Sequence, residues 1–230
     1  MLATQIVPNV YAISFGFVNS FLIDADGLTL IDTGIAGSRD KILRAVAELG
    51  RQPADIRRIL VTHCHGDHTG SLAAVKAATG APVYMHPADA ALVREGESMR
   101  PAQPSPGLPG LIFRLAGPRS TAIEATAVDY EVQDGDELPG GLKAIHTPGH
   151  CAGHLAFFWP QHGGVLFVGD TLGRMFRLGL AIIYEDFAQG QRDLVKLAAL
   201  DFDVACFSHG RAIVGGAAGQ WRDFVKRKGL

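Results

Sequence analysis

Residues 61–70, VTHCHGDHTG, concentrate side chains that bind metal ions. His63, His65, Asp67 and His68 fall within six consecutive positions. Imidazole nitrogens and carboxylate oxygens are ligands of Zn²⁺, which takes three or four of them from a protein. A catalytic ion keeps one position open for water, so four candidates in one segment exceed what a single ion would use. Two metal ions roughly 3.5–4 Å apart fit this segment better.

Two ions require further ligands, and three candidates occur in a similar context. His150 lies in HTPGHCAGH, Asp170 in LFVGDT and His209 in CFSHG. Each follows a run that predicts a strand, as the first segment follows RRILV. Because ligands from different strands can meet where the strands end, we expect these residues to contribute to the same metal site.

The surrounding sequence predicts strands and helices that alternate in two halves. Asp26 and Gly27 mark a turn between two strands, because glycine tolerates positive φ. Apolar residues at helical spacing predict a helix over 38–50, with Ser38 as N-cap and Gly50 as C-cap. This alternation predicts an α/β fold with helices layered outside sheets. Further strands are expected within 57–63, 82–87, 129–150, 154–160, 163–171 and 203–210, and further helices within 69–80, 88–97, 191–200 and 217–229.

The chain is expected to form one domain over 1–230, interrupted by a lid-like insertion at about 97–128. Prolines and glycines in this segment exclude a long regular element. A stretch of this length without regular structure is often a lid or a binding loop. A disordered surface linker is the alternative, and apolar residues such as Leu111 and Phe113 argue against it.

Composition excludes several functional classes. Lys and Arg number 21 against 23 Asp and Glu, so no charge bias favours nucleic acid or an anionic membrane. The start, MLATQIVPNV, shows no signal peptide, and no apolar run is long enough to span a membrane. Three cysteines fit a reducing compartment. We expect a cytoplasmic protein that binds a small molecule, with no nucleic acid or membrane partner.

Four motifs in order resemble those of a known family. H-x-H-x-D-H, then T-P-G-H, G-D-T and S-H-G, resembles the metallo-β-lactamase-fold hydrolases over nearly the whole chain, within their hydroxyacylglutathione hydrolase and lactonase-like branch. The segment LTLIDTG, which contains Asp32, also resembles a strand and turn of that family. The resemblance implies a four-layer αββα sandwich of two mixed β-sheets flanked by helices.

The resemblance also implies a division of the ligands between two metal ions. By that resemblance, His63, His65 and His150 would hold the first ion. Asp67, His68 and His209 would hold the second, and Asp170 would bridge both. Two Zn²⁺ ions are expected, with iron or manganese as alternatives. Asp67 is also expected to act in catalysis by accepting a hydrogen bond from the attacking hydroxide.

Four further residues are expected near the metal site. Asp32 would orient a ligand through a hydrogen bond to its far nitrogen. His154 would do the same or would simply be packed in the core. Arg174 and Tyr184, in the loop after Asp170, are candidates for substrate contact.

The remaining histidines and two cysteines are not expected to bind metal. His86, His146 and His162 are interpreted as surface or core residues. Cys64 and Cys151 each adjoin a histidine that already occupies a ligand position, so both are interpreted as non-ligands.

The expected reaction is metal-assisted hydrolysis. Two zinc ions lower the pKa of a shared water toward about 7 and polarise the substrate, so no Ser or Cys nucleophile is needed. The lack of an export signal argues against an antibiotic substrate. The short segment after His209 argues against a glutathione thioester, and the charge balance argues against transfer-RNA processing. A small ester, thioester or lactone remains.

Apolar loops suggest a lipophilic substrate. Packing in the core and a homodimer contact are the two alternative interpretations of these residues. They are Phe15, Phe17, Phe21, Met175, Phe176, Leu178, Leu180, Ile182 and Ile183.

Two other functions stay open at this point. One is a mononuclear iron persulfide dioxygenase of the same fold, which retention of His68 and His209 does not exclude. The other is a non-enzymatic, metal-stabilised or degenerate binding module, which the complete ligand set disfavours.

Overall fold

The computed structural model describes residues 1–107, 110, 111, 113 and 121–230, and the chain divides into two compact units. Unit 1 comprises Met1–Met99 and Thr121–Gln133, and unit 2 comprises Arg100–Ser120 and Asp134–Leu230. The lid-like insertion expected at 97–128 is therefore divided between the units, and its residues 108, 109, 112 and 114–120 lie outside the described part. The expectation of one domain stays a prediction.

Unit 1 is built on a seven-stranded mixed sheet with the order β1-β2-β3-β4-β5-β6-β8. The pairs from β1 to β4 are antiparallel, and those from β4 through β5 and β6 to β8 are parallel. The strands are β1 (Ala3–Val7), β2 (Val10–Ser14), β3 (Asn19–Asp24), β4 (Leu28–Ile31), β5 (Ile56–Leu60), β6 (Val83–Met85) and β8 (Tyr130–Glu131).

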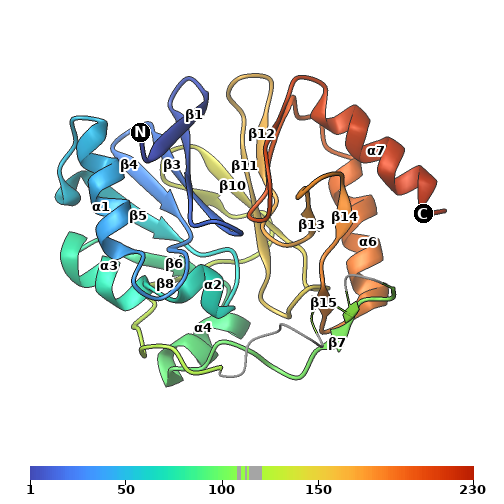
Figure 1. The fold of residues 1–230 in the computed structure, drawn as a ribbon, viewed down its shortest axis with the longest axis horizontal. Coiled ribbons are helices and arrows are strands. Elements are labelled where there is room, and N and C mark those ends of the chain that lie inside the picture. The colour runs from blue at the N-terminus through green and yellow to red at the C-terminus, as the bar shows by residue number, and fades with distance from the viewer. Residues whose placement is uncertain (108–109, 112, 114–120) are drawn as a thin grey trace. The chain divides into compact units, whose positions relative to one another are not determined.

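Helices of unit 1 follow the strands that they connect. They are α1 (Arg39–Glu48), the short 3₁₀ helix η1 (Pro53–Asp55), α2 (Gly66–Thr69), α3 (Leu72–Thr79) and α4 (Pro87–Glu95). Helices α1 and α3 lie along the same side of the sheet (Figure 1). The short α2 begins directly after His65, so the histidine-rich segment is the connection from the carboxyl end of β5 into a helix.

The structure of unit 1 agrees in part with the turn and the helix caps predicted from the sequence. Asp26 and Gly27 form the turn between β3 and β4 with φ of +52° and +80°. Ser38 precedes α1, but its side chain makes no capping hydrogen bond. The C-cap of α1 is Leu49, and Gly50, at φ +71°, follows it instead of being the cap.

Unit 2 contains a six-stranded mixed sheet with the order β17-β16-β12-β11-β10-β9. Only β12 and β16 are paired in parallel in this sheet. Two small two-stranded sheets, β13-β14 and β15-β7, accompany it. The strands are β7 (Gln103–Pro104), β9 (Glu137–Leu138), β10 (Leu142–His146), β11 (Leu155–Trp159), β12 (Val165–Phe167), β13 (Leu172–Gly173), β14 (Gly179–Leu180), β15 (Ile183–Tyr184), β16 (Val204–Cys206) and β17 (Ile213–Val214).

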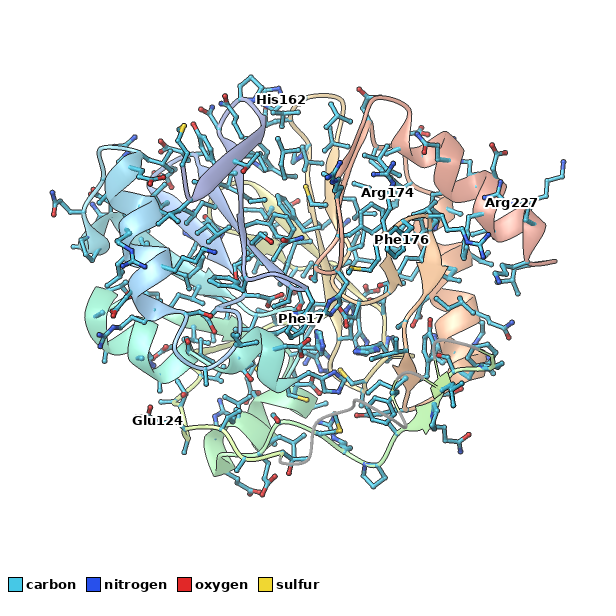
Figure 2. The ribbon with its side chains drawn as sticks, viewed as in Figure 1. Phe17, Glu124, His162, Arg174, Phe176 and Arg227 are labelled. Atoms are coloured by element: carbon cyan, nitrogen blue, oxygen red, sulfur yellow. The ribbon has the colours of Figure 1, made fainter. Side chains whose placement is uncertain are left out.

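Two amphipathic helices cover unit 2. Helices α6 (Phe187–Ala198) and α7 (Ala217–Arg227) lie side by side in Figure 1. Their buried faces share one apolar cluster with the sheet, in which Leu194, Trp221 and Phe207 are fully buried. The indole N–H of Trp221 donates to the carbonyl of Leu194 at 3.0 Å and so joins the two helices. Figure 2 shows Arg227 at the far end of α7.

The predicted α/β class, with two mixed β-sheets flanked by helices, is confirmed. The two-residue strands β7, β13, β14, β15 and β17 were not predicted, because two residues carry no periodicity that could be recognised. Within the described residues, no helix combines the length and the apolar character needed to cross a lipid bilayer.

Candidate functional site

Unit 1 gathers the first histidine cluster at the carboxyl end of β5. His63, His65 and His68 are each at most 5% exposed. Nε2 of His63 lies 3.1 Å from Nδ1 of His65, and the two rings meet edge to face. Strand β5 ends at Leu60 and α2 begins at Gly66, so His63 and His65 lie on the short connection between them and His68 lies in the first turn of the helix.

Hydrogen bonds at the back of this cluster determine which nitrogen is protonated in His63 and in His68. A carboxylate oxygen of Asp32 accepts from Nδ1 of His68 at 2.8 Å. The hydroxyl of Thr62 donates to the same oxygen at 2.7 Å and lies 3.0 Å from Nδ1 of His63. With Nδ1 protonated in both rings, Nε2 of His63 and of His68 carries the lone pair, which is the form that binds metal.

Asp32 is itself held in an uncommon backbone conformation. It is fully buried, and its φ of +59° lies in the left-handed region, which is costly for residues other than glycine but tolerated by Asp and Asn. Its amide donates to Leu60 at 2.9 Å, and its second carboxylate oxygen accepts from the Thr62 amide at 2.8 Å. The carboxylate is thereby held against the end of β5, with one oxygen at Nδ1 of His68, and the role of Asp32 in orienting a metal ligand stays a prediction.

Two carboxylates lie beside this cluster, and Asp67 is more exposed than Asp32. Its side chain is 28% exposed, and one oxygen lies 3.8 Å from Nε2 of His68. It therefore faces the same point as His68 while remaining within reach of solvent.

Unit 2 gathers the second group of predicted ligands around Asp170. One carboxylate oxygen of Asp170 lies 3.5 Å from Nε2 of His150 and 3.2 Å from Nε2 of His209. His150 comes from the connection between β10 and β11, Asp170 follows β12, and His209 follows β16. Nδ1 of His150 lies 3.0 Å from the carbonyl oxygen of Ile183, which can only accept, so Nε2 is the nitrogen that faces Asp170.

The donor atoms of each unit have the spacing of metal ligands. Two ligands about 2.0–2.1 Å from one tetrahedral ion lie about 3.4 Å from each other. The four distances between donor atoms within the units are 3.1, 3.8, 3.5 and 3.2 Å. Neutral imidazoles and carboxylates are ligands that zinc accepts, so both donor sets fit the metal that the sequence predicts.

The other predicted contact residues have defined partners in unit 2. The Arg174 side chain donates to the carbonyls of Arg211 and Ala212 at 3.3 Å, so it is hydrogen-bonded to the segment that follows His209 (Figure 2). Tyr184 is 2% exposed, and its hydroxyl accepts from the Ala181 amide at 3.1 Å. Burial raises the pKa of Tyr184, and its ring packs edge to face beside His150. Substrate contact by either residue stays a prediction.

Histidines and cysteines interpreted as non-ligands occupy varied places. His162 is exposed at the tip of the turn between β11 and β12 (Figure 2). His86 caps α4, where it accepts from the Ala88 amide. Nε2 of His146 lies 2.8 Å from the carbonyl oxygen of Ala152. The three cysteines are buried thiols, and burial raises the pKa of Cys206.

Several residues that support the site were not found from the sequence. Thr62 precedes His63, the first candidate ligand, and a hydroxyl there could have been noted as a partner for a neighbouring ring. Asp193 on α6 accepts from the Gly149 amide at 2.7 Å, which fixes the turn before His150, and burial raises the pKa of this carboxyl. The carbonyl of Ile183 could not be found from the sequence, because every residue has a backbone carbonyl.

Comparison with known proteins places the chain in a family. The model of the Metallo-beta-lactamase superfamily matches residues 13–209. The chain belongs to this superfamily. Its members bind metal ions, typically zinc.

Relatives of this superfamily member extend the comparison. It is 32% identical over 167 residues to Uncharacterized protein YobT of Bacillus subtilis, covering 72% of this chain and 65% of that one. It is 34% identical over 177 residues to a hydroxyacylglutathione hydrolase of Albidiferax ferrireducens, and the match covers 75% of this chain and 55% of that protein. The structure of BJP-1, a subclass B3 metallo-beta-lactamase of Bradyrhizobium japonicum, superposes with a TM-score of 0.74 at 25% identity. The superposition covers 99% of this chain and 92% of BJP-1. The chain thus spans less than two thirds of the length of these two curated relatives.

Proposed function

We propose that this superfamily member is a metal-dependent hydrolase that uses two metal ions, preferably zinc. The proposal assigns His63, His65 and His150 to one ion and Asp67, His68 and His209 to the other, with Asp170 shared. It is supported by the order of the four motifs and by membership of the superfamily. The observation that carries it is the spacing of donor atoms in each unit, 3.1–3.8 Å, which is that of ligands on a common ion.

The proposed chemistry divides between the ions and the chain. When bound, a metal pair acts as a Lewis acid and lowers the pKa of water toward about 7, which provides hydroxide near neutral pH. The chain orients the imidazoles through hydrogen bonds at Nδ1, from Asp32 and Thr62 in unit 1 and from the Ile183 carbonyl in unit 2. Asp67 accepts a hydrogen bond from the attacking hydroxide and so orients it toward a carbonyl carbon.

A small, lipophilic ester, thioester or lactone is the proposed substrate. Met175, Phe176 and Ile182 follow Asp170 in unit 2 and are 56%, 98% and 43% exposed, so they are available to an acyl chain. Phe21 and Ile183 are each 2% exposed and belong to the core, so they are removed from the group that could line such a site. The relative named hydroxyacylglutathione hydrolase favours a thioester.

Two accessory parts of the proposal concern assembly and location. The exposed apolar side chains of the β13-β14 hairpin would also serve a homodimer, which light scattering of the purified protein would detect. A cytoplasmic location is supported by the three cysteines, which are buried and form no disulfide, and cell fractionation tests it.

Metal analysis combined with a substrate panel tests the proposal. We expect about two ions per chain in active protein, loss of activity on chelation, and recovery on adding zinc. The panel should contain thioesters, lactones, esters and phosphodiesters, with a β-lactam included because BJP-1 shares the fold. Preformed zinc–chelator complex is the control for the chelator.

Variants sharpen the same test. Asp170→Asn should lower activity by at least 100-fold, whereas Asp223→Asn, on the exposed face of α7, should leave it unchanged. Active protein with fewer than two ions, or full activity in Asp170→Asn, would contradict the proposal. Iron as the native metal, with oxygen uptake on a glutathione persulfide, would favour the dioxygenase instead.

A further inference from the structure

His154 lies at the base of the connection that carries His150, and its side chain joins two other segments of unit 2. Its Nε2 accepts from the backbone amide of Asp170 at 2.9 Å. Its Nδ1 lies 2.7 Å from the hydroxyl oxygen of Thr147. His154 is fully buried, and Thr147 and Asp170 are 1% and 8% exposed, so both contacts are shielded from water.

The chemistry of these partners fixes the form of the ring. A backbone amide can only donate, so Nε2 of His154 must be the unprotonated nitrogen. The proton of the neutral ring is therefore on Nδ1, where the hydroxyl oxygen of Thr147 accepts it. The imidazole thus has one donor and one acceptor, and each has a partner of the matching kind.

Strand register explains why a side chain holds this amide. Strands β11 and β12 are antiparallel, with Phe157 opposite Phe167, so continuing the register three residues places His154 opposite Asp170. The paired residues end at Phe157 and Phe167, while the carbonyl of His154 accepts from the Thr147 amide at 2.9 Å. The carbonyl of His154 thus continues the pairing toward β10, while its imidazole accepts the Asp170 amide on the side of β12.

We propose that His154 is a positioning residue that sets the direction of the Asp170 carboxylate. Fixing the amide fixes the backbone from which the Cα–Cβ bond of Asp170 projects. That carboxylate lies 3.5 Å from Nε2 of His150 and 3.2 Å from Nε2 of His209, and a shared ligand has to stay close to both nitrogens. The inference rests on the proposed function, because it concerns the residue assigned to both ions.

A matched pair of substitutions separates positioning from packing. In His154→Gln, the side-chain amide can place an oxygen where Nε2 was and keep the bond to the Asp170 amide. In His154→Asn, the shorter side chain can reach only the place of Nδ1, so it keeps Thr147 and loses Asp170. Trp221→Phe is the control, because it removes a different buried hydrogen bond of unit 2, from the indole N–H of Trp221 on α7 to the carbonyl of Leu194 on α6.

Metal affinity, measured by competition with a chromophoric chelator, is the main readout. We expect a 10–100-fold loss in His154→Asn, the range typical when the residue that orients a ligand is removed, and less than about threefold in His154→Gln and Trp221→Phe. The visible spectrum of the cobalt-substituted protein should change in His154→Asn and be restored in His154→Gln. Melting temperatures of the metal-free variants record the loss of packing separately.

Equal affinities of the two His154 variants would overturn the inference, and so would an equal loss in Trp221→Phe. If the wild-type chain binds no metal, the proposed function fails. If it binds two ions and the variants do not differ, only the role of His154 fails.

Discussion

At the scale of single residues, one carboxylate supports two candidate ligands. Asp32 contacts His68 directly and reaches His63 through the Thr62 hydroxyl. Both contacts place the proton on Nδ1, so one side chain selects the metal-binding form of two rings. Such partners influence metal affinity although they do not touch the ion.

Asp32→Asn tests this role. An amide group at this position offers one acceptor to three donors, so we expect one of the rings to change its protonated nitrogen and metal affinity to fall about 10–100-fold. Asp26→Asn is the matched control, since Asp26 also has a positive φ, +52°, but its side chain is 84% exposed and contacts Arg58 instead. Chelator competition measures both variants. Unchanged affinity in Asp32→Asn would refute the role.

At the scale of elements, the turn that carries His150 depends on a close crossing of two backbones. Gly149 lies against Gly190 at the start of α6, and a Cβ on Gly149 would overlap the backbone of Gly190. Gly190 in turn packs against the ring of Tyr184, beside His150. Asp193 on the same helix accepts from the Gly149 amide. Helix α6 therefore positions the ligand turn through contact between two glycines.

Gly149→Ala should destabilise the protein by ~3 kcal/mol, because backbone atoms cannot move aside as a flexible side chain can. Gly219→Ala is the control within α7, where a Cβ meets nothing within 4 Å and alanine should stabilise the helix by ~0.5–1 kcal/mol. Urea unfolding of both variants gives the two free energies. Equal stability of the two variants would show that the crossing tolerates a methyl group.

An ion pair at the edge of unit 1 makes a pH-dependent contribution. Asp129 accepts from Lys76 Nζ and from the Val83 amide, both at 2.7 Å, and joins the chain before β8 to α3 and β6. Partial burial acts to raise the pKa of Asp129, but the bonds from Lys76 and Val83 outweigh it and hold the pKa below its usual value. A lowered pKa means that the contribution is present above the unfolded-state pKa of about 3.9 and is lost as pH falls through the folded-state value.

Asp129→Asn should therefore cost stability at pH 7, by less than about 1 kcal/mol for the ion pair. The difference from the wild type should shrink as the pH is lowered from 5 toward 3. Lys76→Gln should reduce the same pH dependence, since it removes the partner. Urea unfolding at several pH values measures these differences in stability. A difference between Asp129→Asn and the wild type that grows toward low pH would contradict a lowered pKa of Asp129.

At the scale of the whole molecule, the proposed ligands come from both units. Unit 1 supplies His63, His65, Asp67 and His68, and unit 2 supplies His150, Asp170 and His209. The proposed function assigns to each ion ligands from both units, so removing the ligands of either unit would weaken the binding of that ion. Metal stoichiometry distinguishes this arrangement from two separate sites.

His63→Ala in unit 1 and His150→Ala in unit 2 should each leave about one ion per chain. The double variant should also retain one ion, because both substitutions remove ligands of the same ion. Elemental analysis after dialysis against zinc gives these numbers. Loss of both ions only in the double variant would indicate that each unit binds its own ion, contrary to the proposal.

Much of the fold and of the candidate site could be predicted from local pattern. The helices α1, α3, α4, α6 and α7 have apolar spacing that repeats over several turns, and their residues fall within or close to the expected ranges. The ligand candidates were visible because histidine and aspartate are specific in type and lie at strand ends. Ser38 shows the limit, because its position as N-cap was right while its side chain does not cap.

The sequence by itself determined which donor groups are available and in what order they follow the strands, since both are properties of residue type and local periodicity. Only the tertiary structure decided which nitrogen each ring presents. Those choices depend on Asp32, which is 36 residues from His68, and on the Ile183 carbonyl, which is 33 residues from His150. A hydrogen bond between residues so far apart in sequence depends on the path of the chain, and the path depends on packing of the whole unit.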